Sequence, residues 1–448
     1  MNLLRNLSPR GWLWLTLGVA IFVRILLFLT YPVGHFSDTN AYRGIAETVL
    51  SADWPAYNYI RTPGYPLFLA LLGPDRVVYA AQLSLGVATT LLLFYLGWKI
   101  SGQPWFGALA GLAHSLNLGQ LFFEANILSE SLTTFLVALL LGGVAWLLDA
   151  PPQRPAWRLL LMGFLLGLTG GLLTLTRPQF IFLPFWAAFL LVALWHGRSA
   201  ALRWGAALLL ALTSLAFVGG WMLKLHQRFG IWGMDIMSGY HLVQHTGAWF
   251  EYVPDEYAAV RDTYIEYREM RRRETGQPNN AIWDAIPAIQ EASGLGFIEL
   301  SQLMARLSIR LILEHPLRYL VSAAQGWWWF WKAPFYWTPE AIAHPALRAV
   351  VRALVLLERG ALFAANMTFL AGSLALLWKK VRRRLAPGLL VWFAFGTVWF
   401  TSILQTLLDH GDNPRFSVSI QSLVVLLVGW GIVQFIGSKK KIHETAAA

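Results

Sequence analysis

Three acids and three arginines occupy short polar segments between the long apolar runs of this sequence. The acids are Asp38, Glu124 and Glu130, and the arginines are Arg61, Arg177 and Arg415. A carboxylate in such a segment can accept a proton from a reacting hydroxyl, and a fixed guanidinium can stabilise negative charge that develops nearby. Both residue types also have structural alternatives. Asp38 or Ser37 could cap a following helix, and arginines near a membrane surface often extend to phospholipid headgroups.

The composition of the chain is that of an integral membrane protein. Of its 448 residues, 56% are apolar and only 13% are charged, whereas a soluble domain has about 25% charged residues. The lack of cysteine excludes a secreted disulfide scaffold, and the apolar content excludes a disordered chain. The net charge of +11 would point to nucleic acid in a soluble protein, but here the basic residues cluster at the ends of apolar runs. We therefore expect a lipid bilayer, and no nucleic acid, as a partner.

Ten apolar runs approach the roughly 20 residues that a helix needs to cross the hydrocarbon core of a bilayer. They lie near residues 11–31, 77–98, 104–123, 130–148, 158–176, 179–195, 203–223, 355–378, 387–408 and 417–436. The sequence thus predicts an all-α polytopic membrane protein, a bundle of about ten or more transmembrane helices with amphipathic helices at the outer face. Two polar residues fall inside runs. We expect Arg24 to pair with a neighbour or reach the interface, and His114 to be a hydrogen-bonded packing residue.

The basic residues predict the orientation of the chain. Arg5 and Arg10, the cluster at 379–384 and Lys439–Lys441 all fall on one side if every run spans. Cytoplasmic loops carry an excess of Lys and Arg, so both termini are expected in the cytoplasm. The acids of the opposite loops then face outward, which predicts an active site on the extracytoplasmic face. We expect the membrane to be the plasma (inner) membrane of a bacterium.

The apolar runs divide the chain into three parts. Residues 1–223 form an N-terminal transmembrane module with catalytic outer loops, 224–345 an extracytoplasmic or interfacial segment, and 346–448 the C-terminal transmembrane helices and a basic cytoplasmic tail. The Trp-rich stretch 317–337 could cross the membrane, but we expect it to lie in or dip into the outer interface, where indole rings prefer to sit. The charged stretch 251–273 fits a helix that either caps the bundle or receives a substrate.

Four short motifs follow one another on the predicted outer face. They are Asp38 with Tyr42 and Arg61-Thr62-Pro63-Gly64-Tyr65-Pro66-Leu67, then Glu124 to Leu132, then Thr176-Arg177-Pro178, and finally His410-Gly411-Asp412-Asn413-Pro414-Arg415-Phe416. In this order they resemble the signatures of the GT-C superfamily of membrane glycosyltransferases. By pattern the chain is most similar to the protein O-mannosyltransferases and the aminoarabinose transferases that modify lipid A. The middle third of the chain carries no such motif.

The resemblance implies an inverting glycosyltransferase. Its donor would be a sugar on a polyprenyl phosphate such as undecaprenyl phosphate, and its acceptor a hydroxyl on a lipid, glycan or protein. Such a donor already has a good leaving group, but the charge on that phosphate must be stabilised by fixed cations. The attacking hydroxyl needs a base within hydrogen-bond reach.

These requirements assign roles to the candidate residues. Asp38 is the expected catalytic base, and Arg61, Arg177 and Arg415 are expected to bind the donor phosphate. Glu124 and Glu130 form the second acidic motif, of which Glu130 is a weak candidate for the nucleophile of a double displacement. Possible substrate contacts are Tyr42, Tyr59, His35 and His410. Some GT-C members bind a divalent metal, and Asp38, Glu124 and Glu130 are hard ligands that could hold Mg or Mn.

Other functions remain open from the sequence. About ten spans are equally natural for a polytopic transporter or a flippase of lipid-linked sugars, although we find no internal repeat and the polar residues concentrate at one rim. A ligase that uses a polyprenyl diphosphate-linked oligosaccharide would predict more basic residues around the leaving group.

Overall fold

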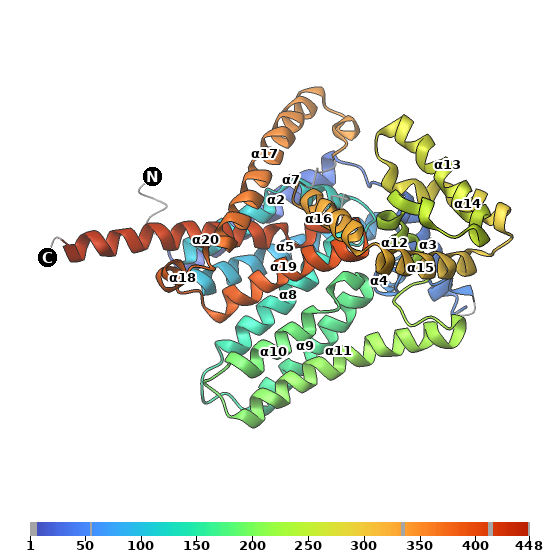
Figure 1. Ribbon diagram of the computed structural model, residues 1–448. Helices are drawn as coiled ribbons and strands as arrows, with labels where there is room; N and C mark the ends of the chain where they lie inside the picture. The colour runs from blue at the N-terminus through green and yellow to red at the C-terminus, as the bar shows by residue number, and fades with distance from the viewer. Residues whose placement is uncertain (1–6, 54–55, 333–336, 411–414, 447–448) are drawn as a thin grey trace.

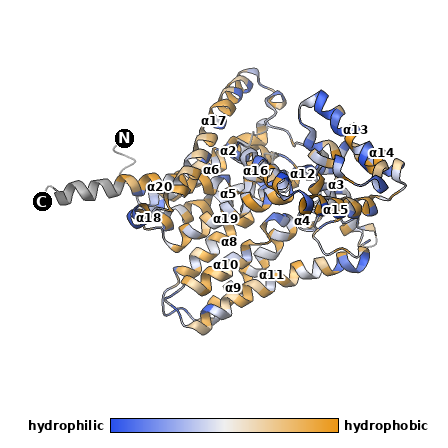
Figure 2. Cartoon of the chain, in the orientation of Figure 1, coloured by the Kyte–Doolittle hydropathy of each residue, from blue (hydrophilic) through white to orange (hydrophobic). Residues whose placement is uncertain are grey.

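The computed structural model describes residues 7–53, 56–332, 337–410 and 415–446 (Figure 1). The described part of the chain is helical, apart from turns, loops and one isolated parallel bridge between Gly34 and Asn126. Figure 2 shows hydrophobic residues along the long helices and hydrophilic residues concentrated in α13 (Ala258–Thr275) and α18 (Lys379–Leu385). The predicted all-α class is therefore confirmed.

Eight helices of the described residues are long and apolar enough to cross a membrane. They are α2 (Pro9–Thr30), α5 (Asp75–Ser101), α8 (Glu130–Leu148), α9 (Ala156–Thr176), α11 (Ala200–Phe229), α17 (Pro345–Ala375), α19 (Leu389–Leu408) and α20 (Arg415–Ala446). Each covers all or most of one of the ten predicted runs. The chain is thus a polytopic helical membrane protein.

The other two predicted runs are shorter or broken. The run 104–123 is split into α6 (Pro104–Ser115) and α7 (Leu118–Ala125), because Asn117 starts a new helix: its side chain accepts a hydrogen bond from the Gln120 amide at 2.8 Å. The run 179–195 forms only α10 (Leu183–Leu194) after the turn that Pro178 begins.

Small residues allow the helices of the bundle to approach closely. A side-chain Cβ at Gly163 or Gly167 of α9 would lie 2.6 Å from the Ala206 carbonyl oxygen or 2.8 Å from that of Leu210, both on α11. Gly107 of α6 is equally close to α5, with the Phe94 carbonyl oxygen 2.5 Å from the position of a Cβ. Such contacts are typical of membrane helices, which associate by close packing because lipid supplies no hydrophobic driving force between them.

A second group of helices lies at one end of the bundle. We call it the cap, residues 238–314, formed by α12 (Ser238–Thr246), α13, α14 (Ala281–Ser293) and α15 (Phe297–Glu314). The cap has its own apolar core and lies beside α3 (Ser37–Leu50) and α4 (Gly64–Leu72), whereas α18 and the C-terminus lie at the opposite end (Figure 1). The predicted boundary at 223/224 falls inside α11, which continues to Phe229.

The Trp-rich stretch forms α16 (Pro316–Lys332) where the cap meets the bundle. One face of α16 packs inward: Trp331 is buried, and the Trp327 indole donates to Ser402 of α19 at 3.2 Å. The other face carries exposed Leu317, Leu320 and Val321. An amphipathic helix with these features fits the predicted interface location better than a full crossing. Residues 333–336 of the stretch lie outside the described residues.

The two ends of the bundle predict a labelling pattern. We expect an impermeant thiol reagent to label intact cells at Asn40→Cys, on the exposed face of α3, but not at Arg382→Cys in the basic helix α18. The chain has no native cysteine, so gel-shift labelling reads each site directly. Permeabilised cells are the control, in which both variants should react. The reverse labelling pattern in intact cells would show that the chain has the opposite orientation in the membrane.

Candidate active site

The first two loops at the cap end are joined by their backbones. The Gly34 amide donates to the Ala125 carbonyl, and the Ile127 amide donates to the Gly34 carbonyl, each at 3.0 Å. A Cβ at Gly34 would overlap the Asn126 side chain, so glycine is needed for this approach. The loop that precedes Asp38 is therefore held against the loop that precedes Glu130.

Asp38 lies in the first turn of α3, and it does not cap the helix. The N-cap residue is Phe36, whose amide donates to the Thr39 hydroxyl at 2.9 Å, and Thr39 in turn donates to the Ile127 carbonyl at 3.0 Å. The Asp38 carboxylate instead accepts hydrogen bonds from two arginines. The capping alternative is therefore wrong for Asp38, while the Ser37 side chain lies outside the described part of the chain.

Arg61 and Arg177 are brought together by the start of α4. A Cβ at Gly64 would lie 2.6 Å from the Thr176 amide nitrogen at the end of α9. Glycine thus lets the loop after Arg61 pack against the end of α9, where Arg177 is the C-cap and Pro178 stops the helix.

Five of the predicted site residues meet in one group, which we call the carboxylate–arginine cluster: Asp38, Arg61, Glu130, Arg177 and Arg415. Arg415 joins its two halves, because its Nη1 donates to Asp38 and its Nε donates to Glu130 Oε1 at 2.6 Å. Arg61 Nη2 donates to the other Asp38 oxygen at 2.8 Å, and Arg177 Nη2 donates to Glu130. These residues come from segments up to 377 positions apart in the chain.

The cluster has an excess of positive charge and one accessible side. Three guanidinium groups face two carboxylates, which leaves a formal charge of +1. Glu130 is fully buried, and among the described residues its Oε2 has no hydrogen-bond partner. Asp38 and Arg61 are each 25% exposed, against 12% for Arg415. An anion that enters from solvent would therefore meet Arg61 and then Arg415.

The electrostatics of Asp38 bear on its expected role. Burial opposes ionisation of this carboxyl, but the charges and hydrogen bonds of Arg415 and Arg61 outweigh burial and hold its pKa well below the usual range. A carboxylate with such a low pKa is a weak base. Asp38 can act as the base only after it loses at least one of these arginines.

Tyr42 borders the cluster, but Tyr59 does not. The Tyr42 ring is buried below the Arg61 guanidinium, 6.0 Å from the ring centroid, and its hydroxyl is 3.5 Å from Ser129 Oγ. Tyr59 instead stacks on Trp221 with 5.1 Å between ring centroids, inside the apolar core of the cap. Its φ of +55° turns the chain so that its carbonyl accepts from the Ile236 amide. Tyr59 therefore lies apart from the carboxylate–arginine cluster, and its role as a substrate contact stays a prediction.

His35 belongs to a separate surface group. Its Nε2 lies 2.7 Å from Asp75, whose carboxylate also accepts from Arg43. The His35 and Asp75 side chains are both exposed. Among the described residues, no hydrogen bond or ion pair joins this group to the carboxylate–arginine cluster, so the role of His35 as a substrate contact stays a prediction.

Glu124 is separated from Glu130 in space, although both belong to the predicted second acidic motif. The Glu124 carboxylate is fully buried and accepts two hydrogen bonds from Arg24 of α2, each at 2.8 Å. Glu124 lies in the last turn of α7 and faces α5, where a Cβ at Gly86 would overlap its carboxylate. Arg24 is thus the buried partner of Glu124, and the prediction that Arg24 pairs with a neighbour is confirmed.

The separation of the acids also bears on the predicted metal. The three acids do not meet at one point, because Glu124 lies apart from the other two. Asp38 and Glu130 lie in the same cluster, but arginines occupy the space beside their carboxylates. Within the described residues, no group of three or more His, Cys, Asp or Glu side chains could hold a metal ion. The residues present therefore do not fit a Mg or Mn site of the predicted kind.

His410 lies beside the cluster in the chain but faces the cap. It is buried, with its ring nitrogens 3.1 and 3.2 Å from Asn279 Nδ2 and its ring edge-on to Trp329. Burial, reinforced by His245, lowers the pKa of His410 to about 4, so the ring is neutral near pH 7. His114, by contrast, meets its expectation as a packing residue, bonded to Ser422 at 2.9 Å.

The sequence did not point to a histidine–carboxylate pair next to the cluster. His241 Nδ1 of α12 lies 3.1 Å from Asp409 Oδ2, at the end of α19. Met237, one turn before His241, contacts Arg61 Nη1 through its sulfur at 3.1 Å. The middle third of the sequence offers one weak signal for this pair, the spacing of His241 and His245 on one helical face.

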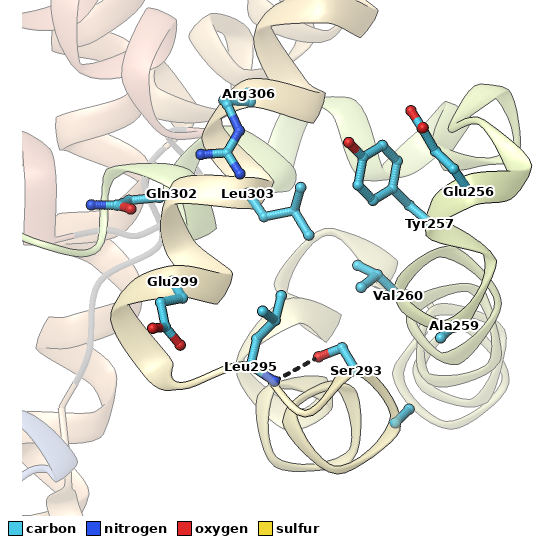
Figure 3. Close-up of a pocket in the computed structure, with 11 residues that line it drawn as sticks. Glu256, Tyr257, Ala259, Val260, Ser293, Leu295, Glu299, Gln302, Leu303 and Arg306 are labelled. Carbon is cyan, nitrogen blue, oxygen red and sulfur yellow. Dashed lines mark hydrogen bonds between the residues drawn. The ribbon is translucent and has the colours of Figure 1, made fainter.

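The cap also has a separate hollow of about 460 Å³ (Figure 3). Glu299, Gln302, Leu303 and Arg306 of α15 line one side, and Tyr257 and Val260 line the facing side. None of its lining residues belongs to the carboxylate–arginine cluster.

The chain matches no protein-family model, no curated protein and no solved structure. The functional argument therefore depends on the geometry of the cluster and its surroundings.

Proposed function

We propose that the chain is an inverting glycosyltransferase that moves a sugar from a polyprenyl-phosphate donor to a hydroxyl on a lipid, glycan or protein at the outer face of the membrane. The observation that carries the proposal is the carboxylate–arginine cluster. It gathers three arginines around two carboxylates where the bundle meets the cap. A phosphate leaving group needs cations that are fixed before the reaction begins, and these arginines supply them.

Donor binding can change the chemistry of Asp38. A phosphate that enters beside Arg61 competes with Asp38 for the Arg61 and Arg415 guanidinium groups, which can donate paired hydrogen bonds to either anion. As the phosphate takes these contacts, the pKa of Asp38 rises toward its ordinary value. The carboxylate then carries negative charge that is no longer paired with these arginines, beside the reacting sugar where positive charge develops.

The state of Glu130 favours a single displacement. A double displacement would need a second carboxylate that reaches the anomeric carbon. Glu130 is fully buried, and its Oε1 already accepts from both Arg177 and Arg415. Its geometry suits a residue that holds the two arginines in place. Asp38 is then the one accessible carboxylate of the cluster. With no second carboxylate to act as nucleophile, the acceptor hydroxyl attacks the anomeric carbon directly, which inverts its configuration.

The depth of the cluster suits a lipid-linked substrate. The exposed apolar face of α16, next to the cap, fits the boundary between headgroups and acyl chains. A polyprenyl phosphate places its charged group at the same boundary, with its tail in the hydrocarbon core. We propose that the reaction takes place at the outer surface of a bacterial plasma membrane.

A transporter or a flippase of lipid-linked sugars is the second candidate. The buried polar pair of Arg24 and Glu124 favours it, because ionisable residues inside spanning segments often mark a transport path. The two functions differ in a simple assay. Purified protein in nanodiscs is given a panel of polyprenyl-phosphate sugars, and donor consumption is followed. Consumption of one donor supports the transferase, whereas binding and translocation without consumption support the transporter.

Replacing Arg415 should weaken donor binding strongly. We expect Arg415→Gln to raise the donor Kd by about 10- to 150-fold, the loss of a charge-assisted hydrogen bond worth about 1.5–3 kcal/mol. Quenching of tryptophan fluorescence by the donor measures this change. Arg43→Gln is the matched control, since Arg43 pairs with Asp75 at the same end of the bundle and outside the cluster. Equal donor affinity in Arg415→Gln and wild type would show that the cluster does not bind the donor phosphate.

A further inference from the structure

The histidine–carboxylate pair next to the cluster has the arrangement of an oriented base. Asp409 fixes the His241 ring through Nδ1, and Nε2 has no hydrogen-bond partner among the described residues. The ring is 31% exposed, so Nε2 can be reached from solvent or by a substrate. A carboxylate that binds one ring nitrogen sets the tautomer and leaves the other nitrogen as the proton acceptor.

The pair lies near Arg61, the most exposed of the three arginines of the cluster. Met237 is the N-cap residue of α12, its carbonyl accepts a hydrogen bond from the His241 amide at 3.2 Å, and its sulfur contacts Arg61. Asp409 and Arg415 stand at the two ends of one connection, between α19 and α20. The pair and the cluster thus both involve the start of α12, the C-cap of α19 and the first residue of α20.

The surroundings of the pair hold it in place. The His241 ring packs edge-on against Trp283 of α14, with 5.3 Å between ring centroids. In the orientation that satisfies both neighbours, the Gln244 amide donates to Asp409 and accepts from the Trp283 indole at 3.0 Å. Asp409 is only 12% exposed, and its carboxylate lies next to the imidazole.

We propose that His241 is the catalytic base of the transfer and that Asp409 positions it, an inference that rests on the proposed function. The acceptor oxygen forms a bond to the anomeric carbon while the bond from that carbon to the phosphate oxygen breaks. The electron pair of the broken bond leaves with the phosphate. The hydroxyl proton moves to His241 Nε2, and Asp409 stabilises the imidazolium. Asp38 then serves the reacting centre through its negative charge, without taking the proton.

Charged groups from three segments set the protonation of His241. Burial disfavours the imidazolium, but the hydrogen bond and charge of Asp409, aided by Asp235, outweigh burial and the opposing charge of Arg61, and the pKa of His241 is raised. A base must be unprotonated to act. Activity should therefore fall as the pH falls through the pKa of His241, somewhat above the ordinary histidine value.

The test is the pH profile of kcat/KM for donor consumption, with water or an added hydroxyl as the acceptor. In wild type we expect a rise with pH to a plateau. His241→Gln should lose the rising limb and about 10²- to 10³-fold of the plateau rate. Asp409→Asn should keep the limb but move it to lower pH, because the group that raises the His241 pKa is gone. A purely structural role for Asp409 would not move the limb in that direction.

The controls separate the possible failures. His344→Gln removes an exposed histidine before α17 and should leave the profile unchanged. Asp38→Asn should keep the limb at a reduced rate. The proposal is wrong if folded His241→Gln keeps the rising limb of the pH profile, or if only Asp38→Asn loses it. Asp38 would then be the group that accepts the proton. If wild type consumes no donor at any pH, the transferase itself is wrong.

Discussion

Asp38→Asn should lower turnover by about 10³-fold while the protein binds its donor at least as tightly as wild type. The two effects have one cause. Asp38 competes with the donor phosphate for Arg61 and Arg415, so removing its charge leaves both guanidinium groups to the phosphate. The same charge is required at the reacting centre, where positive charge develops on the sugar as the phosphate leaves. Tighter binding with lost turnover would show that Asp38 acts on the transition state and not on donor affinity.

The measurement needs donor affinity and turnover on the same preparation. Tryptophan fluorescence reports donor binding, and loss of the polyprenyl-phosphate sugar reports turnover. Asp75→Asn is the matched control, because Asp75 also pairs with an arginine at the cap end but lies outside the cluster. Wild-type turnover in Asp38→Asn would show that the ion pairs of Asp38 with Arg61 and Arg415 are only structural. Weakened donor binding with normal folding would place Asp38 in donor recognition instead.

The spanning helices and the common end of the bundle that holds the site residues could be predicted from the sequence for a physical reason. A bilayer imposes a minimum apolar length, and the alternation of spans assigns every short loop to one of two faces. Four site residues lie shortly before or after apolar runs: Asp38, Arg61, Arg177 and Arg415. Counting the runs along the chain therefore assigns all four to the same end of the bundle. The break between α6 and α7 is less visible, because Asn117 interrupts a run that is apolar on both sides.

The partners within the site could not be predicted in the same way. Glu124 and Glu130 are six residues apart, but the bend between α7 and α8 turns one toward Arg24 and the other toward Arg415. The direction of that turn depends on the bridge between Gly34 and Asn126, which joins segments distant in the chain. His241 and Asp409 are separated by 168 positions, and no short motif relates them.

The largest stability effect should come from the buried pair of Arg24 and Glu124. We expect Glu124→Gln to lower the free energy of unfolding by about 3–5 kcal/mol, since the variant leaves the Arg24 charge buried without its counter-charge. Both side chains are almost inaccessible, at 3% and 0%. Denaturation in detergent, followed by tryptophan fluorescence, measures the change. Asp284→Asn is the control, because its pair with Arg271 is exposed in the cap and should contribute at most about 1 kcal/mol.

The double variant Arg24→Met with Glu124→Met separates stability from function. Replacing both members of a buried ion pair by apolar residues removes the cost of desolvating two charges, so most of the lost stability should return. Because Glu124 pairs with Arg24, and no hydrogen bond or ion pair among the described residues joins it to the carboxylate–arginine cluster, we expect this double variant to bind and consume the donor like wild type. A folded double variant that no longer uses the donor would show that Glu124 belongs to the site after all. A double variant that still consumes donor would leave the pair a structural role and remove the main support for a transport path through the bundle.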